Sequence, residues 1–270
     1  MQKREILGVG WDVGGWRGKK QVVAVARWKD GRPECFGCSE PFSTAAIPPE
    51  DGLNTFIRLA WTRDCPTDVL DRYGVVVAID APLGFPVAFQ KLVAGGLPPA
   101  RPVVAEIDNP FAYRDCERHV YKTFRAKKPL SAPFGKLGDR ATVALVYARA
   151  WAAMHRMLIL PFQDAPEDAP VIIEVYPALA KDRKTARCLE PFTGFIPQTV
   201  QWGAEACDAC ICALMALAFR SENQDLLPEL VGPTGQGHFA SEGWIYHPRA
   251  SSATRAAGTR PGLQTSPSGR

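Results

Sequence analysis

The chain has 270 residues, of which 46% are hydrophobic and 22% charged, with 23 glycines and 24 prolines. This balance is typical of a folded globular protein and excludes an intrinsically disordered one. No stretch approaches the roughly 18 consecutive apolar residues of a membrane-spanning helix, and the opening MQKREILGVGWDVGG lacks the features of a signal peptide. The eight cysteines are too few and too scattered for a disulfide scaffold. We therefore expect a cytoplasmic protein with no membrane partner.

The net charge of +4 is concentrated near the C-terminus. Residues 249–270 contain four arginines and no lysine or acidic residue, so the rest of the chain is neutral. A neutral body does not predict broad electrostatic binding of nucleic acid. Any basic surface must be local, and residues 114–140 are the candidate because they hold eight basic and three acidic residues.

The first part of the chain predicts an antiparallel meander. Apolar runs at residues 6–12, 21–28 and 35–42 are separated by turn residues. Residues 51–61 then show helical spacing, and residues 75–80 form the continuous apolar run of a strand buried on both faces. A helix that leads to a parallel strand is therefore expected to follow the meander.

Residues 81–110 are rich in proline and glycine and predict an ordered loop with a short helix at 88–93. Loops of this length in compact domains are commonly functional.

The remaining elements are helices around one more buried strand. Helices are expected at 113–124, 140–158 and 202–219, a strand at 171–176, and a short strand at 243–246. This order is that of a ribonuclease H-like domain: a mixed β-sheet, with three antiparallel strands and then parallel strands, flanked by helices. One domain is predicted over residues 1–248, followed by a disordered tail at 249–270.

Acidic residues stand at the ends of these predicted elements. Asp12 and Asp80 end two strands, Glu174 lies within a third, and Glu205 and Asp208 share a face of the last helix. An ionised carboxylate at the end of a buried strand is costly unless it is paired or metal-bound. Two Mg²⁺ or Mn²⁺ ions about 4 Å apart can serve phosphodiester cleavage. The alternative is that each acid caps a helix or pairs with an arginine.

Seven short motifs resemble domain-of-unknown-function family 429, described as predicted nucleases with a ribonuclease H-like fold. They occur in order and cover nearly the whole chain except the tail. The motifs are GVGWDVGG (8–15), VVVAIDAPLGFP (75–86), YRDCERHV (113–120), PLSAPFGKLG (129–138), IIEVYPA (172–178), DACICALMALAF (208–219) and EGWIYHP (242–248).

The resemblance implies roles for the acidic residues. Asp12 and Asp80 occupy the first and second acidic positions of the fold, and Asp208, with Glu205, supplies the helical position. The spacing of the helical pair also resembles that of Holliday-junction resolvases, although both positions are Asp there. Glu174, in IIEVYPA, is a further candidate ligand for Mg²⁺ or Mn²⁺.

Candidate substrate contacts come from the basic segment. Arg114, Arg118 and Lys122 share one helical face, and guanidinium groups suit phosphate oxygens. Ser131 and Lys136, in PLSAPFGKLG, could donate to a phosphate or a carboxylate. The alternative is a solvated helix face on which neighbouring acids pair with the arginines.

Two functions follow from these patterns. The first is a metal-dependent nuclease in which Asp12, Asp80 and Asp208 hold the ions while Arg114 and Arg118 grip the nucleic-acid backbone. The second is a non-catalytic nucleic-acid or nucleotide-binding module on the same fold. A third interpretation takes residues 12–15 as the phosphate hairpin of a sugar-kinase or actin-like ATPase. It is weaker because those enzymes pair two such domains.

Overall fold

The structure is a computed structural model. It describes residues 4–18, 20–61, 64–98, 102–124, 128–182, 185, 187–198, 200, 204–221 and 223–249. The tail predicted after Arg249 lies outside these residues, as do Arg125 and Lys127 of the basic segment.

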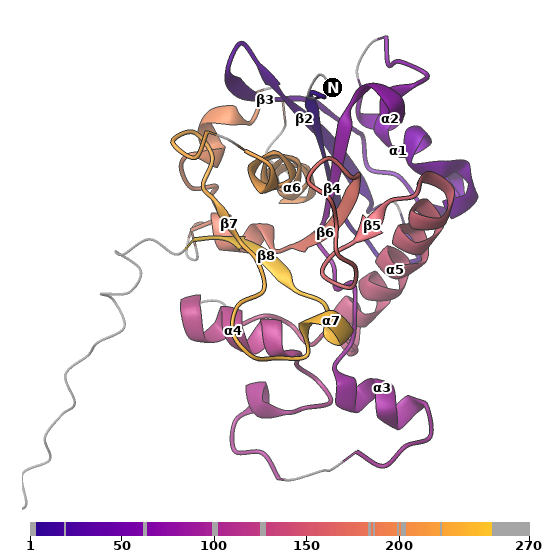
Figure 1. Cartoon of the computed structure of the whole chain (residues 1–270), viewed down its shortest axis with the longest axis vertical. Helices are drawn as coiled ribbons and strands as arrows, with labels where there is room; N and C mark the ends of the chain where they lie inside the picture. The colour runs from indigo at the N-terminus through magenta and orange to yellow at the C-terminus, as the bar shows by residue number, and fades with distance from the viewer. Residues whose placement is uncertain are drawn as a thin grey trace, which may run out of the picture.

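A mixed sheet flanked by helices forms the centre of the protein (Figure 1). The strand order is β3-β2-β1-β4-β6-β8-β7, and β5 also pairs with β6. Strands β1 to β3 are antiparallel, whereas β1, β4, β6 and β8 run parallel to one another. The predicted mixed α/β architecture is therefore confirmed. The strands are β1 (Ile6–Asp12), β2 (Val22–Lys29), β3 (Arg32–Cys38), β4 (Gly74–Ile79), β5 (Leu158–Ile159), β6 (Val171–Val175), β7 (Leu230–Val231) and β8 (Ile245–Pro248).

Helices cover both faces of this sheet. Helix α6 lies against one face, and α1 and α5 lie on the other, while α3, α4 and α7 gather toward one end (Figure 1). Within the described ranges, no helix has both the length and the apolar character needed to cross a membrane. The helices are α1 (Gly52–Ala60), α2 (Val69–Arg72), α3 (Val87–Val93), α4 (Asp115–Phe124), α5 (Gly135–His155), α6 (Ala204–Phe219) and α7 (Phe239–Glu242).

Helix α5 begins five residues before the predicted start at Arg140. Gly135 and Gly138 lie in the turn that the prediction left out of the helix. At Gly138 a Cβ atom would lie 2.5 Å from the carbonyl oxygen of Pro133, so only glycine fits this first turn without displacement. The glycine is therefore a packing requirement of the helix and not a sign of its absence.

The contact between β1 and α6 is unusually close. On the opposite face of β1, Leu7, Val9 and Trp11 pack among large side chains of α1 and α5. On the α6 face, by contrast, a Cβ atom at Gly10 would lie 2.1 Å from the carbonyl oxygen of Ala209. The α6 backbone therefore rests directly on the strand, and this contact fixes the helix relative to the carboxyl end of β1.

We predict that Gly10→Ala destabilises the fold, because the new methyl group would overlap the α6 backbone. Overpacking of this kind typically costs about 1–3 kcal/mol, which denaturant unfolding would measure. Gly232→Ala is the matched control, since the nearest atom to its Cβ is a Tyr246 ring carbon at 3.6 Å. Equal losses in the two variants would contradict the proposed role of the β1–α6 contact.

Candidate functional site

The strand register brings Asp12 and Asp80 to the same edge of the sheet. Asp12 ends β1, and Asp80 directly follows β4. Trp11 and Ile79 are parallel partners, and the Asp80 amide donates to the Trp11 carbonyl oxygen at 2.9 Å. Because Trp11 and Ile79 point into the α1–α5 side of the core, the next side chain on each strand points to the α6 side. The two carboxylates therefore share both an edge and a face.

Asp208 of α6 completes an electrostatic cluster with these two residues. Burial, followed by repulsion from Asp208, raises the pKa of Asp12 to about 7. Burial and the charges of Asp12 and Asp208 raise the pKa of Asp80 well above its ordinary value. Burial also raises the pKa of Asp208, although Lys181 opposes this effect. We refer to Asp12, Asp80 and Asp208 as the aspartate cluster.

The members of the aspartate cluster differ in their partners. Asp208 Oδ1 lies 2.5 Å from Lys181 Nζ. In the described part of the chain, Asp12 and Asp80 form no side-chain hydrogen bond or ion pair, although Asp12 is only 5% exposed. A buried carboxylate without a partner must keep a proton or acquire a cation. Asp12 and Asp80 are therefore the least compensated acids of the site.

Two cations and one further acid surround the cluster. Arg140 of α5 and Lys181 both lower the pKa of Asp12 and of Asp80, while Glu205, at the start of α6, raises that of Asp12. The structure thus brings together four of the five predicted acidic residues. Sequence analysis did not assign Arg140 or Lys181 to the site. Their only signal was basic charge, because neither lies in a spacing pattern with the aspartates.

The aspartate cluster is more open than a single-ion site. Among the described residues, the three-residue group with ligand atoms all within 4.8 Å of one another is Asp115, His238 and Glu242. This group could hold a metal ion. His238 and Glu242 are close in the chain, but Asp115 lies 123 residues before His238, so no sequence spacing predicted the group of three. The ligands of a two-ion site are farther apart than those of a single-ion site, because they are divided between ions about 4 Å apart.

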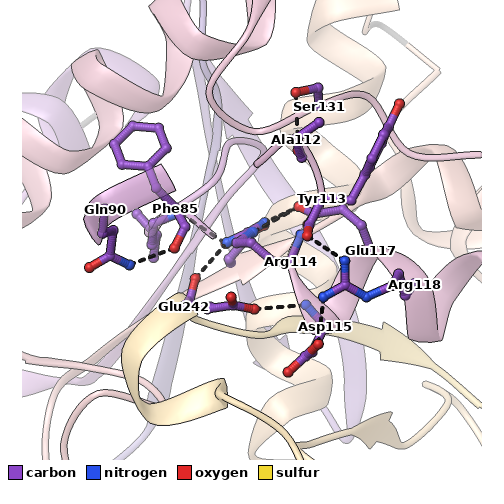
Figure 2. Close-up of polar contacts among 12 residues, drawn as sticks. Phe85, Gln90, Ala112, Tyr113, Arg114, Asp115, Glu117, Arg118, Ser131 and Glu242 are labelled. Atoms are coloured by element: carbon purple, nitrogen blue, oxygen red, sulfur yellow. Dashed lines mark hydrogen bonds and ion pairs between the residues drawn. The ribbon is translucent and has the colours of Figure 1, made fainter. Parts of the chain in front are cut away.

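Hydrogen bonds already tie the acids of this group to nearby helix ends, and Figure 2 shows Asp115 and Glu242 among them. The two oxygens of Glu242 accept from the amides of Val87 and Asp115, at 2.7 and 2.8 Å. Asp115 Oδ2 accepts from the His238 amide at 2.8 Å, and its Oδ1 lies 2.6 Å from an Arg118 nitrogen. Glu242 thus caps the starts of α3 and α4, and Asp115 caps the start of α7. This capping explains why the two acids lie close together.

Arg114 does not lie where a phosphate could reach it, which corrects the sequence-based expectation. Its side chain is fully buried, and its guanidinium donates to Glu174 Oε1 at 2.5 Å and to Glu117 Oε1 at 2.8 Å. A third bond, of 3.1 Å, reaches the Glu242 carbonyl oxygen (Figure 2). Arg114 is therefore a structural cation that connects α4, β6 and the end of α7.

The same network corrects the expectation that Glu174 is a metal ligand. Glu174 Oε2 accepts from Arg114 and from the Leu83 amide, at 2.8 and 2.9 Å. In β6, Ile173 and Val175 pack on the α6 side of the sheet, so Glu174 points to the opposite face from Asp12. Its charge is compensated, and it does not join the aspartate cluster.

The other predicted substrate contacts are spread over the α4 region. Arg118 donates to the Tyr113 carbonyl oxygen at 2.6 Å, and Ser131 Oγ donates to the Ala112 carbonyl oxygen at 3.0 Å. Both groups thus help to hold this region together (Figure 2). Lys122 and Lys136 are exposed, with no ion pair among the described residues.

A pocket opens beside Asp80, with an empty volume of about 490 Å³ that includes open solvent. Arg140 and Tyr176 line it together with Asp80, and apolar residues such as Leu137 form other parts of its wall. Burial, followed by the charges of Asp80 and Asp208, raises the pKa of Tyr176 to about 12. The pocket and the aspartate cluster are therefore neighbours.

We predict that Arg114→Leu strongly destabilises the protein, because it leaves Glu174 and Glu117 buried without their cation. Breaking a buried ion pair typically costs about 3–5 kcal/mol, measurable by denaturant unfolding. In the control, Arg72→Leu, an exposed ion pair with Asp68 is lost, and stability should hardly change. Equal effects would show that the buried network contributes little.

The comparisons with known proteins identify a family and no individual relative. No curated protein and no solved structure matches the chain. A family model described as "Protein of unknown function (DUF429)" matches residues 10–183, which include Asp12, Asp80, Arg140 and Lys181 but not α6. Since this match spans more than half of the chain, the protein belongs to the DUF429 family.

Proposed function

We propose that this protein is a metal-dependent phosphodiesterase of the nuclease type, with the aspartate cluster as its active centre. The observation that carries the proposal is the lack of compensation at Asp12 and Asp80, whose carboxylates have no partner among the described residues. Protein side chains at such positions normally find a cation or a hydrogen-bond donor. A hard divalent cation such as Mg²⁺ or Mn²⁺ suits an all-oxygen ligand set.

The sheet topology supports the same proposal. A ribonuclease H-like fold is consistent with three antiparallel strands at β1 to β3, followed by β4 and β6 parallel to β1. In this arrangement one acid ends the first strand, one follows the fourth, and one lies on the last long helix. Asp12, Asp80 and Asp208 occupy these three positions.

The residues present fit the binding of divalent ions. Asp12 interacts electrostatically with both other members of the cluster, so Asp12, Asp80 and Asp208 would together hold the ions. Bound there, the ions would supply an activated water and would stabilise the charge that develops on the phosphate. Lys181 holds one oxygen of Asp208 and keeps that side chain oriented toward the cluster.

Metal binding should depend steeply on pH. Because the pKa of Asp12 is raised to about 7, this carboxyl binds a proton more tightly in the folded chain than in the unfolded one. Affinity for Mn²⁺ should be weak at pH 5.5 and should rise through pH 7 as the proton leaves. Calorimetric titration at several pH values measures this. An affinity that does not vary between pH 5.5 and 8 would contradict the assignment of Asp12.

Asp12→Asn should affect metal binding and stability in opposite directions. Without metal, the raised pKa means that Asp12 costs stability as the pH rises from 3.8 to about 7, and the cost is complete above that pH. Asn should therefore stabilise the metal-free protein at pH 8. A shift from 3.8 to about 7 corresponds to at most about 4 kcal/mol. The same variant should lose Mn²⁺ binding. Asp164→Asn, at an exposed position, is the control and should change neither property.

The catalytic proposal is tested by hydrolysis of single-stranded DNA and RNA oligonucleotides and of a chromogenic phosphodiester, each with Mn²⁺ or Mg²⁺. Asp12→Asn and Asp80→Asn should each lower the rate by about 100-fold or more, since metal catalysis contributes several kcal/mol. Asp164→Asn should retain full activity. Mn²⁺ binding that requires Asp12, without hydrolysis of any of these substrates, would favour the non-catalytic binding module over the enzyme.

A further inference from the structure

Arg140 lines the pocket beside Asp80. It is partly buried, and among the described residues it forms no hydrogen bond or ion pair. Its charge nevertheless acts on Asp12, Asp80 and Asp208, which places the guanidinium near the aspartate cluster without a direct bond to any of its carboxylates. A guanidinium is a preferred partner of phosphate oxygens, because its donors form a planar fork.

The rest of the pocket differs from a phosphate site. Leu130, Leu137 and Ile245 contribute apolar surface, and Tyr176 adds an aromatic ring. Glu117 and Glu174 also belong to the lining, but both are buried and their carboxylates are already bonded to Arg114. These walls suit an uncharged, flat group.

The size of the pocket limits what can enter. Its enclosed volume of about 90 Å³ is below the roughly 300–1,000 Å³ of usual small-molecule sites, so it has room for one small group such as a nucleobase and for nothing larger. Binding of a long duplex draws on an extended basic surface, whereas the chain outside residues 249–270 has no net charge. The structure thus favours recognition of a single nucleotide over recognition of a long nucleic-acid duplex.

We propose that the pocket binds a single nucleotide unit of the substrate, with its base against Tyr176 and Leu137 and its phosphate on Arg140. This inference rests on the proposed phosphodiesterase function and adds the substrate class to it. Arg140 is a substrate-binding residue at the boundary between pocket and aspartate cluster. A phosphate on Arg140 therefore lies beside Asp80, where the proposed ions are held.

The test compares two probes, adenosine 5′-monophosphate and inorganic phosphate, titrated calorimetrically into the full chain with and without Mn²⁺. The nucleotide should bind at least 10-fold more tightly than phosphate, because only the nucleotide fills the apolar pocket. Arg140→Gln should weaken both probes by about 10-fold or more, as expected for loss of a charge-assisted contact. Arg149→Gln, an exposed arginine on the same helix, is the matched control and should weaken neither.

A second pair of variants separates the pocket from the phosphate contact. Leu137→Trp should fill the pocket and weaken the nucleotide about 10-fold, while phosphate and Mn²⁺ binding stay unchanged. If Leu137→Trp does not fold, Leu130→Trp tests the same wall from a side chain that is 63% exposed.

The outcomes distinguish this inference from the proposed function. Equal affinities for nucleotide and phosphate, with Mn²⁺ binding intact, would overturn the nucleotide pocket and leave the metal site standing. Nucleotide binding that both Arg140→Gln and a pocket-filling variant weaken, in a protein that binds no Mn²⁺, would support the pocket and overturn the phosphodiesterase. Unchanged nucleotide affinity in Arg140→Gln would remove Arg140 from the substrate site.

Discussion

The direct contact between the α6 backbone and β1 is the constraint on which the rest of the site depends. Side chains larger than hydrogen at Gly8 and Gly10 would overlap the carbonyl oxygens of Ala213 and Ala209. Because no side-chain layer separates the two elements on this face, an acid on α6 comes close to the acid that ends β1. The aspartate cluster is therefore a consequence of backbone packing as much as of the acids themselves.

The buried acids of this protein fall into two groups that differ in how their charge is compensated. Glu174 and Glu117 share the guanidinium of Arg114, and Glu242 accepts two backbone amides. These bonds explain why the three acids are buried without any need for a ligand. Asp12 and Asp80 have no such partners among the described residues. Only this second group lacks a direct bond from the described part of the chain, although the charges of Arg140 and Lys181 lower the pKa of both acids.

The sequence was sufficient to predict the longer strands, because continuous apolar runs such as residues 75–79 have few alternatives to burial. The two-residue strands β5 and β7 were missed, and Leu158 of β5 was assigned to the preceding helix, which ends at His155. It also predicted that Asp12, Asp80 and Asp208 would interact, since strand ends and helix position follow from the order of elements. It could not predict that Glu174 lies outside the aspartate cluster, because this depends on the side of the sheet to which the residue points. Burial of Arg114 was equally hidden, because helical spacing shows which residues share a face but not what covers that face.

Binding of divalent cations at the aspartate cluster is the property on which the proposed function depends. Anomalous X-ray scattering from crystals soaked in Mn²⁺ tests it most directly, because the signal locates the ion without reference to any substrate. We predict a peak bonded to the Asp12 carboxylate, at about 2.1 Å as for Mg²⁺, with Asp80 or Asp208 as a further ligand. A peak bound by Asp115, His238 and Glu242, with no signal at Asp12, would contradict it.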